Sequence, residues 1–310
     1  MYKGLHVAVV VPAHNEELLI GQTITTVPEF VDWIVVIDDA STDETAKRAL
    51  ETGDPRLNLI EHVTNTGVGG AIIDGHKRAL ELGADVNVVM AGDAQMNPAY
   101  LPALLDPIAE QGYGFTKANR FYSRQALAGM PVVRIFGSIV LSFATKVASG
   151  YWNLFDPQNG YTAVTSEALG RIDLDRVARR YSFENDLLIS LGIANVRAKD
   201  VPVPSRYGNE VSGMRMVKVI PEISRLLFTG FWRRMLLKYV LMSFSPIALL
   251  LFAGLFLCLA GSVVGIWAIV VTPSIDSPSA GTVLLAVGPL LVGINMLVHA
   301  LALDIQQSPD

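Results

Sequence analysis

Two long segments without a charged side chain dominate the C-terminal third of this 310-residue chain. No Asp, Glu, Lys or Arg occurs from Tyr239 to Val271 or from Gly281 to Leu303. Each segment exceeds the roughly 20 apolar residues that span the hydrocarbon core of a bilayer. One such run could be a buried core helix, but two in succession favour transmembrane helices at about 239–271 and 283–303. Hydrophobic residues make up 51% of the chain and charged residues only 17%, which is apolar for a soluble enzyme.

The distribution of basic residues predicts how these helices are oriented. Several Lys and Arg residues lie in segment 214–238, whereas the connecting loop, Thr272–Gly281, has none. The positive-inside rule then places the N-terminal domain, residues 1–213, and the short tail, 304–310, in the cytoplasm. We therefore expect a multi-pass membrane protein with a cytoplasmic catalytic domain. No cleavable signal peptide is expected, because the first apolar run is short and ends at Pro12.

Segment 214–238 alternates basic residues with Met, Leu, Ile, Phe231 and Trp232. Its pattern is typical of juxtamembrane amphipathic helices drawn to anionic headgroups, although a solvated helix with an apolar core face is the alternative. The net charge of −5, with basic residues near the membrane, argues for a membrane surface or a phosphorylated ligand and against nucleic acid. Cys258 is the only cysteine, which excludes disulfides and zinc–thiolate sites.

Small residues in the first apolar run offer one route to self-association. Gly254, Ala260, Gly261 and Gly265 would allow close helix packing, so a homo-oligomer is possible.

The N-terminal part alternates strand patterns with helix patterns. The expected strands are His6–Val11, Trp33–Ile37, Leu57–Glu61, Asp85–Met90 and Phe115–Ala118. The expected helices are Glu17–Thr26, Asp43–Leu50, Gly69–Leu82 and Pro102–Glu110. This alternation predicts an α/β fold of Rossmann type, with a mostly parallel sheet and right-handed crossovers.

Paired carboxylates, Asp38 and Asp39, follow the second of these strands directly. Ligands of parallel α/β sheets bind beyond the carboxyl ends of the strands, so the pair marks a candidate site. Alternatively, Asp38 caps a loop and Asp39 is solvated. Ser41 and Glu44 have the spacing of a capping box for the next helix.

A dinucleotide-binding domain is the obvious competitor for this pattern. It would need a glycine-rich turn directly after the first strand, where this chain has Pro12–Glu16 instead. The glycine cluster Gly67–Gly70 follows the third strand and carries no Walker lysine. We interpret it as a tight turn into a helix.

Four segments in order carry a more specific signal: Val10–Glu16, Val36–Asp43, Asn65–Ala71 and Ala91–Pro98. Together they resemble family 2 glycosyltransferases with a GT-A fold, over roughly the first 230 residues. With the C-terminal hairpin, the chain is similar to the dolichyl-phosphate mannose and polyprenyl-phosphate glucose synthase group.

The resemblance implies a nucleotide-sugar site at the strand ends. Asp39 corresponds to the acid that reads the base, and Pro12, Ala13 and Glu16 to the segment packing base and ribose. Glu16 could instead complement the dipole of the following helix. The implied donor-binding set is Pro12, Ala13, Glu16, Asp38, Asp39, Gly92 and Asp93.

A divalent cation is also implied. Asp93, with Gln95 as a second ligand, would hold Mg²⁺ or Mn²⁺, which prefer carboxylate and carbonyl oxygens. Many relatives carry Asp-x-Asp, and the first of those positions is Ala91 here. The alternative for Asp93 is a turn residue.

On the acceptor side, the resemblance implies that Arg120, Arg134, Ser138 and Arg206 hold a lipid phosphate, since several guanidinium groups are needed beside a sugar diphosphate. Each arginine alone could equally be an exposed surface residue. Asp156 could act as a base or orient these arginines, and Glu184 and Asp186 are expected at a helix start. The expected catalytic residues are Asp93, Arg120, Arg134 and Asp156.

The expected function is inverting transfer of a hexose from a UDP- or GDP-sugar to the phosphate of a polyprenyl lipid, either undecaprenyl or dolichyl phosphate. Three alternatives stay open. They are a family 2 enzyme acting on a lipid or polysaccharide hydroxyl, a sugar nucleotidyltransferase, and an inactive membrane-tethered partner.

Overall fold

The computed structural model describes residues 1–122, 132–204, 216–271 and 278–309, without the side chains of 132–135 and 216–219. It contains two compact units, which are described separately. Unit 1 comprises Met1–Trp232 and Pro309–Asp310, and unit 2 comprises Arg233–Ser308.

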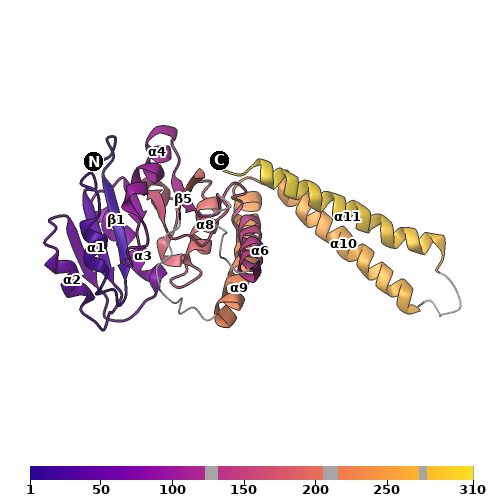
Figure 1. Ribbon diagram of the computed structural model, residues 1–310. Coiled ribbons are helices and arrows are strands. Elements are labelled where there is room, and N and C mark those ends of the chain that lie inside the picture. The colour runs from indigo at the N-terminus through magenta and orange to yellow at the C-terminus, as the bar shows by residue number, and fades with distance from the viewer. Residues whose placement is uncertain (123–131, 205–215, 272–277, 310) are drawn as a thin grey trace. The chain divides into compact units, whose positions relative to one another are not determined.

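Unit 1 is built on a seven-stranded sheet with the strand order β3-β2-β1-β4-β6-β5-β7 (Figure 1). Four parallel strands form its first half: β3 (Leu57–Glu61), β2 (Trp33–Asp38), β1 (Val7–Ala13) and β4 (Val86–Val89). Every residue of β1 is buried, as expected for a central parallel strand covered on both faces. The predicted α/β sheet is confirmed.

The second half of the sheet contains two strands that the sequence pattern did not predict. They are β6 (Thr162–Thr165), which runs antiparallel between β4 and β5 (Phe115–Asn119), and β7 (Ala198–Pro202), parallel to β5. Strand β6 has only four residues, and β7 includes Lys199 and Asp200, so neither carries a strong apolar signal. The sheet is therefore mixed.

Helices cover both faces of this sheet. Val7, Val9 and Val11 of β1 pack in a cluster with residues of α1 (Ile20–Thr25) and α4 (Leu101–Gln111). Ala8 and Val10 pack with α3 (Val68–Glu81) on the opposite face. This alternation follows from the two-residue period of a strand. Short 3₁₀ segments, Pro98–Tyr100 and Leu174–Arg176, complete this part together with α7 (Ser166–Gly170).

The four helices predicted in this half all form, with boundaries shifted by one to three residues. The predicted capping box is wrong. Helix α2 (Thr45–Glu51) begins at Thr45 without a side-chain cap from its N-cap residue, Glu44. The Ser41 hydroxyl instead accepts a hydrogen bond from the backbone N–H of Asn15 at 2.9 Å, and therefore links two strand ends.

Unit 1 also contains three longer helices, α6 (Val132–Ser149), α8 (Phe183–Ile193) and all but the last two residues of α9 (Met216–Arg234). The helix start expected at Glu184 and Asp186 is confirmed, since α8 begins at Phe183 and has both acids in its first turn. A buried hydrogen bond of 2.9 Å from Thr145 to Asn185 joins α6 to α8. Ile189 of α8 packs with Ile223 and Leu227 of α9.

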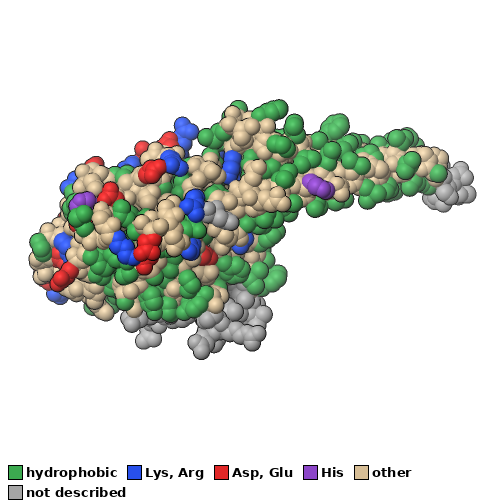
Figure 2. Space-filling model, turned by 90° about the horizontal axis from the view of Figure 1, so that it is seen from above, with side chains coloured by type: hydrophobic (Ala, Val, Ile, Leu, Met, Phe, Trp, Pro, Cys, Tyr) green, Lys and Arg blue, Asp and Glu red, His purple; other side chains and the backbone are tan. Residues whose placement is uncertain are grey.

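Unit 2 is a helical hairpin of α10 (Pro246–Val271) and α11 (Ala280–Gln306) (Figure 1). The most apolar 18-residue stretches of these helices have mean hydropathies of 2.6 and 2.1, and both helices are long and apolar enough to cross a membrane. Green apolar side chains cover most of the hairpin surface in Figure 2. The run from residue 239 to 271 is not one helix, however. A π-helical segment, Met235–Leu241, ends before α10 begins at a proline, which lacks the N–H needed to continue an earlier helix.

Glycines hold the two hairpin helices together. A Cβ at Gly254 would lie 2.9 Å from the carbonyl oxygen of Gly293, and one at Gly261 would lie 2.6 Å from that of Ala286. Gly254 and Gly261 are two of the small residues that were expected to mediate a homo-oligomer. Here they pack the two helices of one chain against each other.

Candidate functional site

Polar residues from three strand ends line a cavity of about 310 Å³ in unit 1. The cavity is lined by Pro12, Ala13, His14, Glu16, Asp39, Asn65, Gly67, Val68, Ala71, Ala91, Gly92, Arg180 and Tyr181. Its volume is at the lower end of the range for small-molecule sites. The position beyond β1, β2, β3 and β4 is where a parallel sheet binds ligands.

Asp39 is the most heavily bonded side chain at this edge. Its carboxylate accepts hydrogen bonds from the backbone N–H groups of Thr66 and Gly67, each at 2.8 Å, and from the Thr66 hydroxyl at 3.0 Å. His62 Nδ1 lies 2.8 Å from the same carboxylate, and its Nε2 lies 3.3 Å from Asp74. Burial acts to raise the pKa of Asp39, but these hydrogen bonds outweigh it and hold the pKa below its usual value. Asp39 is thus a fixed, ionised wall of the cavity and is not solvated.

The neighbouring acids have different roles. Asp38 is buried, and its Oδ1 accepts a hydrogen bond from Ser41 N at 2.9 Å, so it caps the turn and does not line the cavity. Glu16 does line the cavity. Because α1 begins only at Ile20 and has no acid in its first turn, the helix-dipole alternative for Glu16 is wrong.

Three residues just beyond the strand ends have left-handed backbone conformations. Asn15, Ala40 and Ala94 have φ values of 59°, 58° and 54°. Asparagine tolerates this region, whereas alanine does so at a cost of roughly 1–2 kcal/mol. Strain of this kind concentrates at functional sites.

Asp93 lies in the turn after β4, next to Gly92, which lines the cavity. Its Oδ1 accepts a hydrogen bond from Gln95 N at 3.1 Å, and burial raises its pKa. In the described part of the chain no Lys or Arg pairs with Asp93. No cluster of three or more His, Cys, Asp or Glu side chains suited to a metal was found among the described residues. A single half-buried carboxylate beside an amide still fits Mg²⁺ or Mn²⁺, which retain waters and take further ligands from substrate phosphates.

On the acceptor side, Arg120 and Asp156 form a two-pronged ion pair. Arg120 Nε and Nη2 lie 2.7 and 3.0 Å from the two carboxylate oxygens of Asp156, which is almost fully buried. Such fork-to-fork pairing fixes the plane of the guanidinium. Asp156 therefore orients Arg120. Ser138 is half-buried on α6, whereas the side chain of Arg134 and the whole of Arg206 lie outside the described residues.

Two ionisable residues near this pair were missed. Lys117 on β5 is fully buried and donates to the carbonyl oxygen of Asn159. Burial lowers its pKa, opposed by Asp156, Glu184 and Asp200. Burial raises the pKa of Asp200 on β7 to about 6, while its carboxylate accepts hydrogen bonds from Phe155 N and Asn119. The sequence signal that could have identified Lys117 is its position, as a lysine, within an otherwise largely apolar strand.

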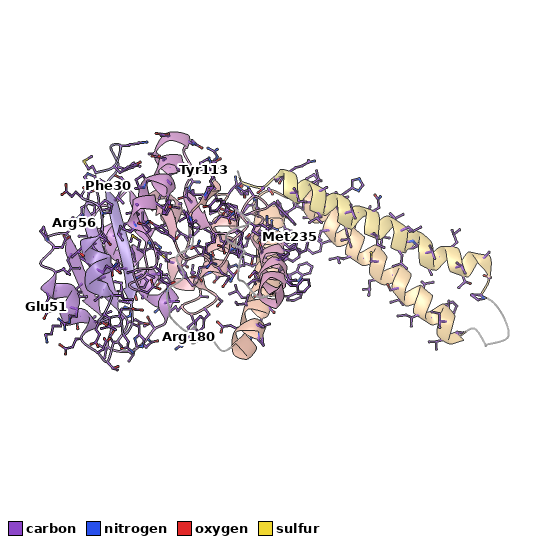
Figure 3. The ribbon with its side chains drawn as sticks, viewed as in Figure 1. Phe30, Glu51, Arg56, Tyr113, Arg180 and Met235 are labelled. Carbon is purple, nitrogen blue, oxygen red and sulfur yellow. The ribbon has the colours of Figure 1, made fainter. Side chains whose placement is uncertain are left out.

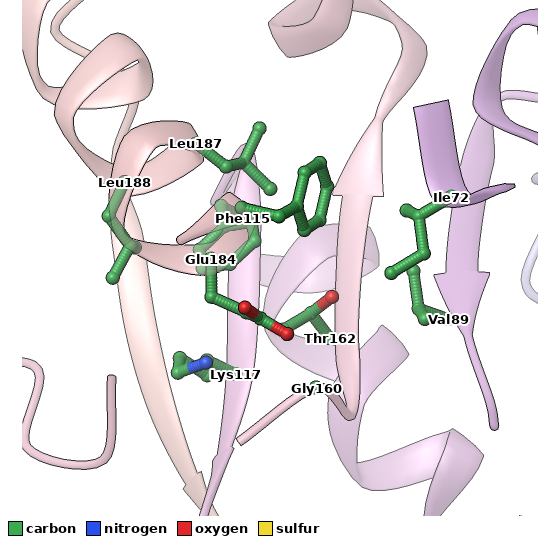
Figure 4. A pocket seen from close by; sticks show the side chains of 10 residues that line it. Ile72, Val89, Phe115, Lys117, Gly160, Thr162, Glu184, Leu187 and Leu188 are labelled. Carbon is green, nitrogen blue, oxygen red and sulfur yellow. The ribbon is translucent and has the colours of Figure 1, made fainter. Parts of the chain in front are cut away.

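Glu184 and Lys117 line one small cavity of about 10 Å³, beside Thr162 and Gly160 (Figure 4). Its volume is about that needed for one water molecule. Burial raises the pKa of Glu184, and the nearby Lys117 opposes the shift.

Arg180 and Tyr181 were also missed. They lie about 110 residues beyond the glycine turn, in the segment that precedes α8, and line the main cavity. No local pattern in the sequence indicates that they meet the strand ends.

Known proteins resemble this chain over most of unit 1. The UDP-N-acetylglucosamine–dolichyl-phosphate N-acetylglucosaminyltransferase of Methanococcus voltae is 30% identical over 244 residues, covering 74% of this chain and 94% of that protein. The undecaprenyl-phosphate mannosyltransferase of Micrococcus luteus is 31% identical over 208 residues, covering 64% and 83%.

Solved structures share the fold. Glucosyl-3-phosphoglycerate synthase of Mycobacterium tuberculosis, in complex with UDP, superposes with a TM-score of 0.55 at 20% identity, covering 74% of this chain and 80% of that one. Its complex with Mn²⁺, UDP and glucosyl-3-phosphoglycerate gives a TM-score of 0.54 at 21% identity with the same coverage. The expected GT-A type of fold is confirmed. The model of the family named Glycosyl transferase family 2 matches residues 8–174, more than half of the chain. The chain therefore belongs to glycosyl transferase family 2.

Proposed function

We propose that this protein transfers a sugar from a nucleotide sugar to the phosphate of a polyprenyl lipid, with inversion at the anomeric carbon. The observation that carries the proposal is the pairing of a strand-end cavity, walled by Asp39 and Glu16, with the Arg120–Asp156 ion pair at the end of β5 in the same unit.

The donor assignment follows from the chemistry of the cavity. Fixed acceptors such as the Asp39 carboxylate suit the N–H groups of a nucleobase, and the extended segment Pro12–Ala13 at the end of β1 suits packing against a base and ribose. Solved complexes of the similar synthase contain UDP, and we extend this binding to the present chain. UDP- and GDP-sugars are both compatible with an acidic acceptor.

A divalent cation held by Asp93, with Gln95, belongs to the same proposal. When bound, Mg²⁺ or Mn²⁺ would offset the negative charge of the diphosphate leaving group. The similar synthase has been solved with Mn²⁺, which supports this assignment. Asp93 and Gln95 come from one short turn, so they can approach one ion together.

The acceptor assignment rests on Arg120. A lipid phosphate is ionised near neutral pH, and one of its oxygens can attack C1 without a general base. The bond between C1 and the diphosphate oxygen then breaks, and its electron pair leaves with the nucleoside diphosphate. Asp156 is committed to orienting Arg120 and is not needed as a base. Arg134, Ser138 and Arg206 would complete the phosphate site, and relatives that act on dolichyl and undecaprenyl phosphate support this acceptor class.

A membrane location would bring this site to its lipid substrate. Helix α6 exposes Phe136, Ile139, Val140 and Phe143, and α9 exposes Ile220 and Phe228. Exposed apolar faces with basic neighbours suit a membrane interface. We infer that residues 1–213 form the cytoplasmic catalytic domain, that 214–238 lie in the interface, and that the hairpin spans the bilayer.

A transfer assay with the purified full chain tests the proposal. The probes are labelled UDP- and GDP-sugars with Mn²⁺ or Mg²⁺, and either a polyprenyl phosphate or the corresponding polyprenol. We expect product only with the phosphate, and with the inverted anomeric configuration. Transfer to the polyprenol alone would reject the acceptor assignment, and a retained configuration would reject direct displacement. An Asp93→Ala protein with unchanged metal-dependent turnover would reject the metal site.

A further inference from the structure

The glycine turn before α3 is shaped by a distant segment of the chain. The backbone N–H of Gly70 donates to the carbonyl oxygen of Arg179 at 2.8 Å. A Cβ at Gly69 would lie 2.6 Å from the Cβ of Phe183 and 2.8 Å from the carbonyl carbon of Arg179. The cluster Gly67–Gly70 is therefore more than a tight turn, because it lets segment 178–183 approach the helix directly.

Arg180 gains its place at the cavity through this contact. A Cβ at Gly67 would lie only 3.0 Å from the Cγ of Arg180, so the arginine stem packs against bare backbone. Figure 3 shows Arg180 at the opposite end of unit 1 from Phe30, which precedes β2. The arginine therefore lies at the edge of the sheet where the parallel strands end.

The charges around the cavity give Arg180 a role. Among the described lining residues, Glu16 and Asp39 are the carboxylates, and Arg180 is the only permanent cation. Of the other cations just before segment 178–183 and on α3, Arg176 pairs with Asp173 and Lys77 with Asp175. For Arg180, no carboxylate among the described residues lies at ion-pair distance. A diphosphate entering this acidic cavity requires positive charge, and a guanidinium matches two phosphate oxygens at once.

We propose that Arg180 contacts the diphosphate of the nucleotide sugar and contributes to donor affinity. This inference deepens the proposed function and rests on it. The arginine reaches the donor from the segment before α8, where its stem packs against Gly67, the residue whose N–H binds Asp39. It strengthens binding of the diphosphate without reading the base.

Binding titrations of three ligands separate this role from a structural one. Uridine, UMP and UDP are titrated calorimetrically, with Mn²⁺, into the full-length protein and its Arg180→Gln variant, and guanosine, GMP and GDP are used in parallel. The loss of affinity should be about tenfold or more for the diphosphate, smaller for the monophosphate and absent for the nucleoside. Arg180→Lys should recover part of the loss.

Arg179→Gln is the matched control, because it makes the same change of charge one residue away, at a side chain that does not line the cavity. It should bind all three ligands as the unmodified protein does. The inference would be overturned if Arg180→Gln bound the diphosphate as tightly as the unmodified protein does. It would also be overturned if the variant lost as much affinity for the nucleoside as for the diphosphate.

The proposed function can fail separately. If Arg180→Gln weakens diphosphate binding but the unmodified protein transfers no sugar, the inference stands and the proposed function falls. If transfer occurs and Arg180→Gln binds UDP and GDP normally, the inference falls alone. A protein that binds neither nucleotide overturns both.

Discussion

Asp39 shows how one side chain can organise a site without being exposed to solvent. Its two oxygens accept hydrogen bonds from the turn into α3 and from His62 at the end of β3, while its own backbone N–H donates to the carbonyl oxygen of Ala13. The sequence indicates an acid at a strand end, which is enough to predict a site. It could not show that His62 and Thr66 bind the carboxylate, because those partners lie 23 and 27 residues away.

Replacing Asp39 with Asn should lower the free energy of unfolding of unit 1, in addition to any effect on ligand binding. The amide would present an N–H₂ group to backbone N–H donors that now have an acceptor, at a cost of about 2–3 kcal/mol. Because the pKa of Asp39 is lowered in the folded protein, its contribution is present above about pH 4 and is lost as the pH falls further. The variant should therefore lose most stability relative to the unmodified protein at pH 7 and least at pH 3, measured by denaturant unfolding.

Asp38→Asn is the control for this prediction. It retains an acceptor oxygen for Ser41 N and should cost well under 1 kcal/mol, the size of one retained turn contact. Equal losses in the two variants, or a loss for Asp39→Asn that does not change with pH, would contradict the explanation.

At the scale of elements, the predictable part of unit 1 is the part with strong periodicity. Strands β1 to β5 and helices α1 to α4 each have apolar residues at strand or helix spacing that a local pattern can detect. The rest depends on tertiary contacts. Strand β6 is too short to show a pattern, and β7 is partly polar, with Asp200 accepting a hydrogen bond from the backbone of Phe155 in loop 155–160. The approach of segment 178–183 to Gly67–Gly70 is also non-local.

Loop 155–160 connects buried charges to the acceptor side of the proposed site. The backbone of Phe155 accepts a hydrogen bond from Ser142 and donates one to Asp200. Arg120 forms an ion pair with Asp156. Lys117 donates a hydrogen bond to the carbonyl oxygen of Asn159. The loop therefore sets the position of Arg120 through several anchors on β5, β7 and α6.

Lys117→Met should loosen this loop while the donor cavity stays intact. The carbonyl of Asn159 would lose its donor, and the carboxylates facing Lys117 would lose a counter-charge, which typically costs about 3–5 kcal/mol when buried. We expect the KM for polyprenyl phosphate to rise severalfold while UDP or GDP affinity changes less than about twofold, since donor and acceptor groups bind separately. Steady-state kinetics and calorimetry measure the two effects.

Lys199→Met on β7 is the matched control, since this lysine contacts Gln111 outside the loop. It should leave both constants unchanged. A Lys117→Met protein with normal lipid KM, or with donor affinity reduced as strongly, would show that the loop does not position the acceptor site.

At the scale of the whole molecule, each unit has its own source of stability. Unit 1 has large clusters of buried apolar side chains on both faces of its sheet, whereas unit 2 exposes most of its apolar side chains and includes a buried ionic cluster. In that cluster, Arg234 lies 2.6 and 3.0 Å from the two oxygens of Asp304, and the Tyr239 hydroxyl donates to the same carboxylate at 2.5 Å. An acid in the last turn of α11 opposes the helix dipole, so its partner explains its presence.

Breaking this cluster should destabilise the hairpin non-additively. Arg234→Met leaves the Asp304 carboxylate buried without its cation and should cost about 3–5 kcal/mol, whereas adding Asp304→Leu should recover much of the loss. Thermal unfolding of the full chain in detergent, over the four proteins of the cycle, measures the coupling. If the stability losses of the two single variants add up in the double variant, Arg234 and Asp304 are not energetically coupled.

The alanines at positions 40 and 94, both left-handed, bear on the motion of the proposed donor site. Glycine at either position would remove backbone strain of roughly 1–2 kcal/mol, which exceeds the cost of about 0.4–1 kcal/mol that comes from giving the unfolded chain more freedom. Stability alone therefore favours glycine. Alanine, however, narrows the range of conformations that each turn can sample in the folded protein. The strand ends are therefore restricted in conformation before a ligand binds. Ligand binding there would cost little backbone conformational entropy of the protein.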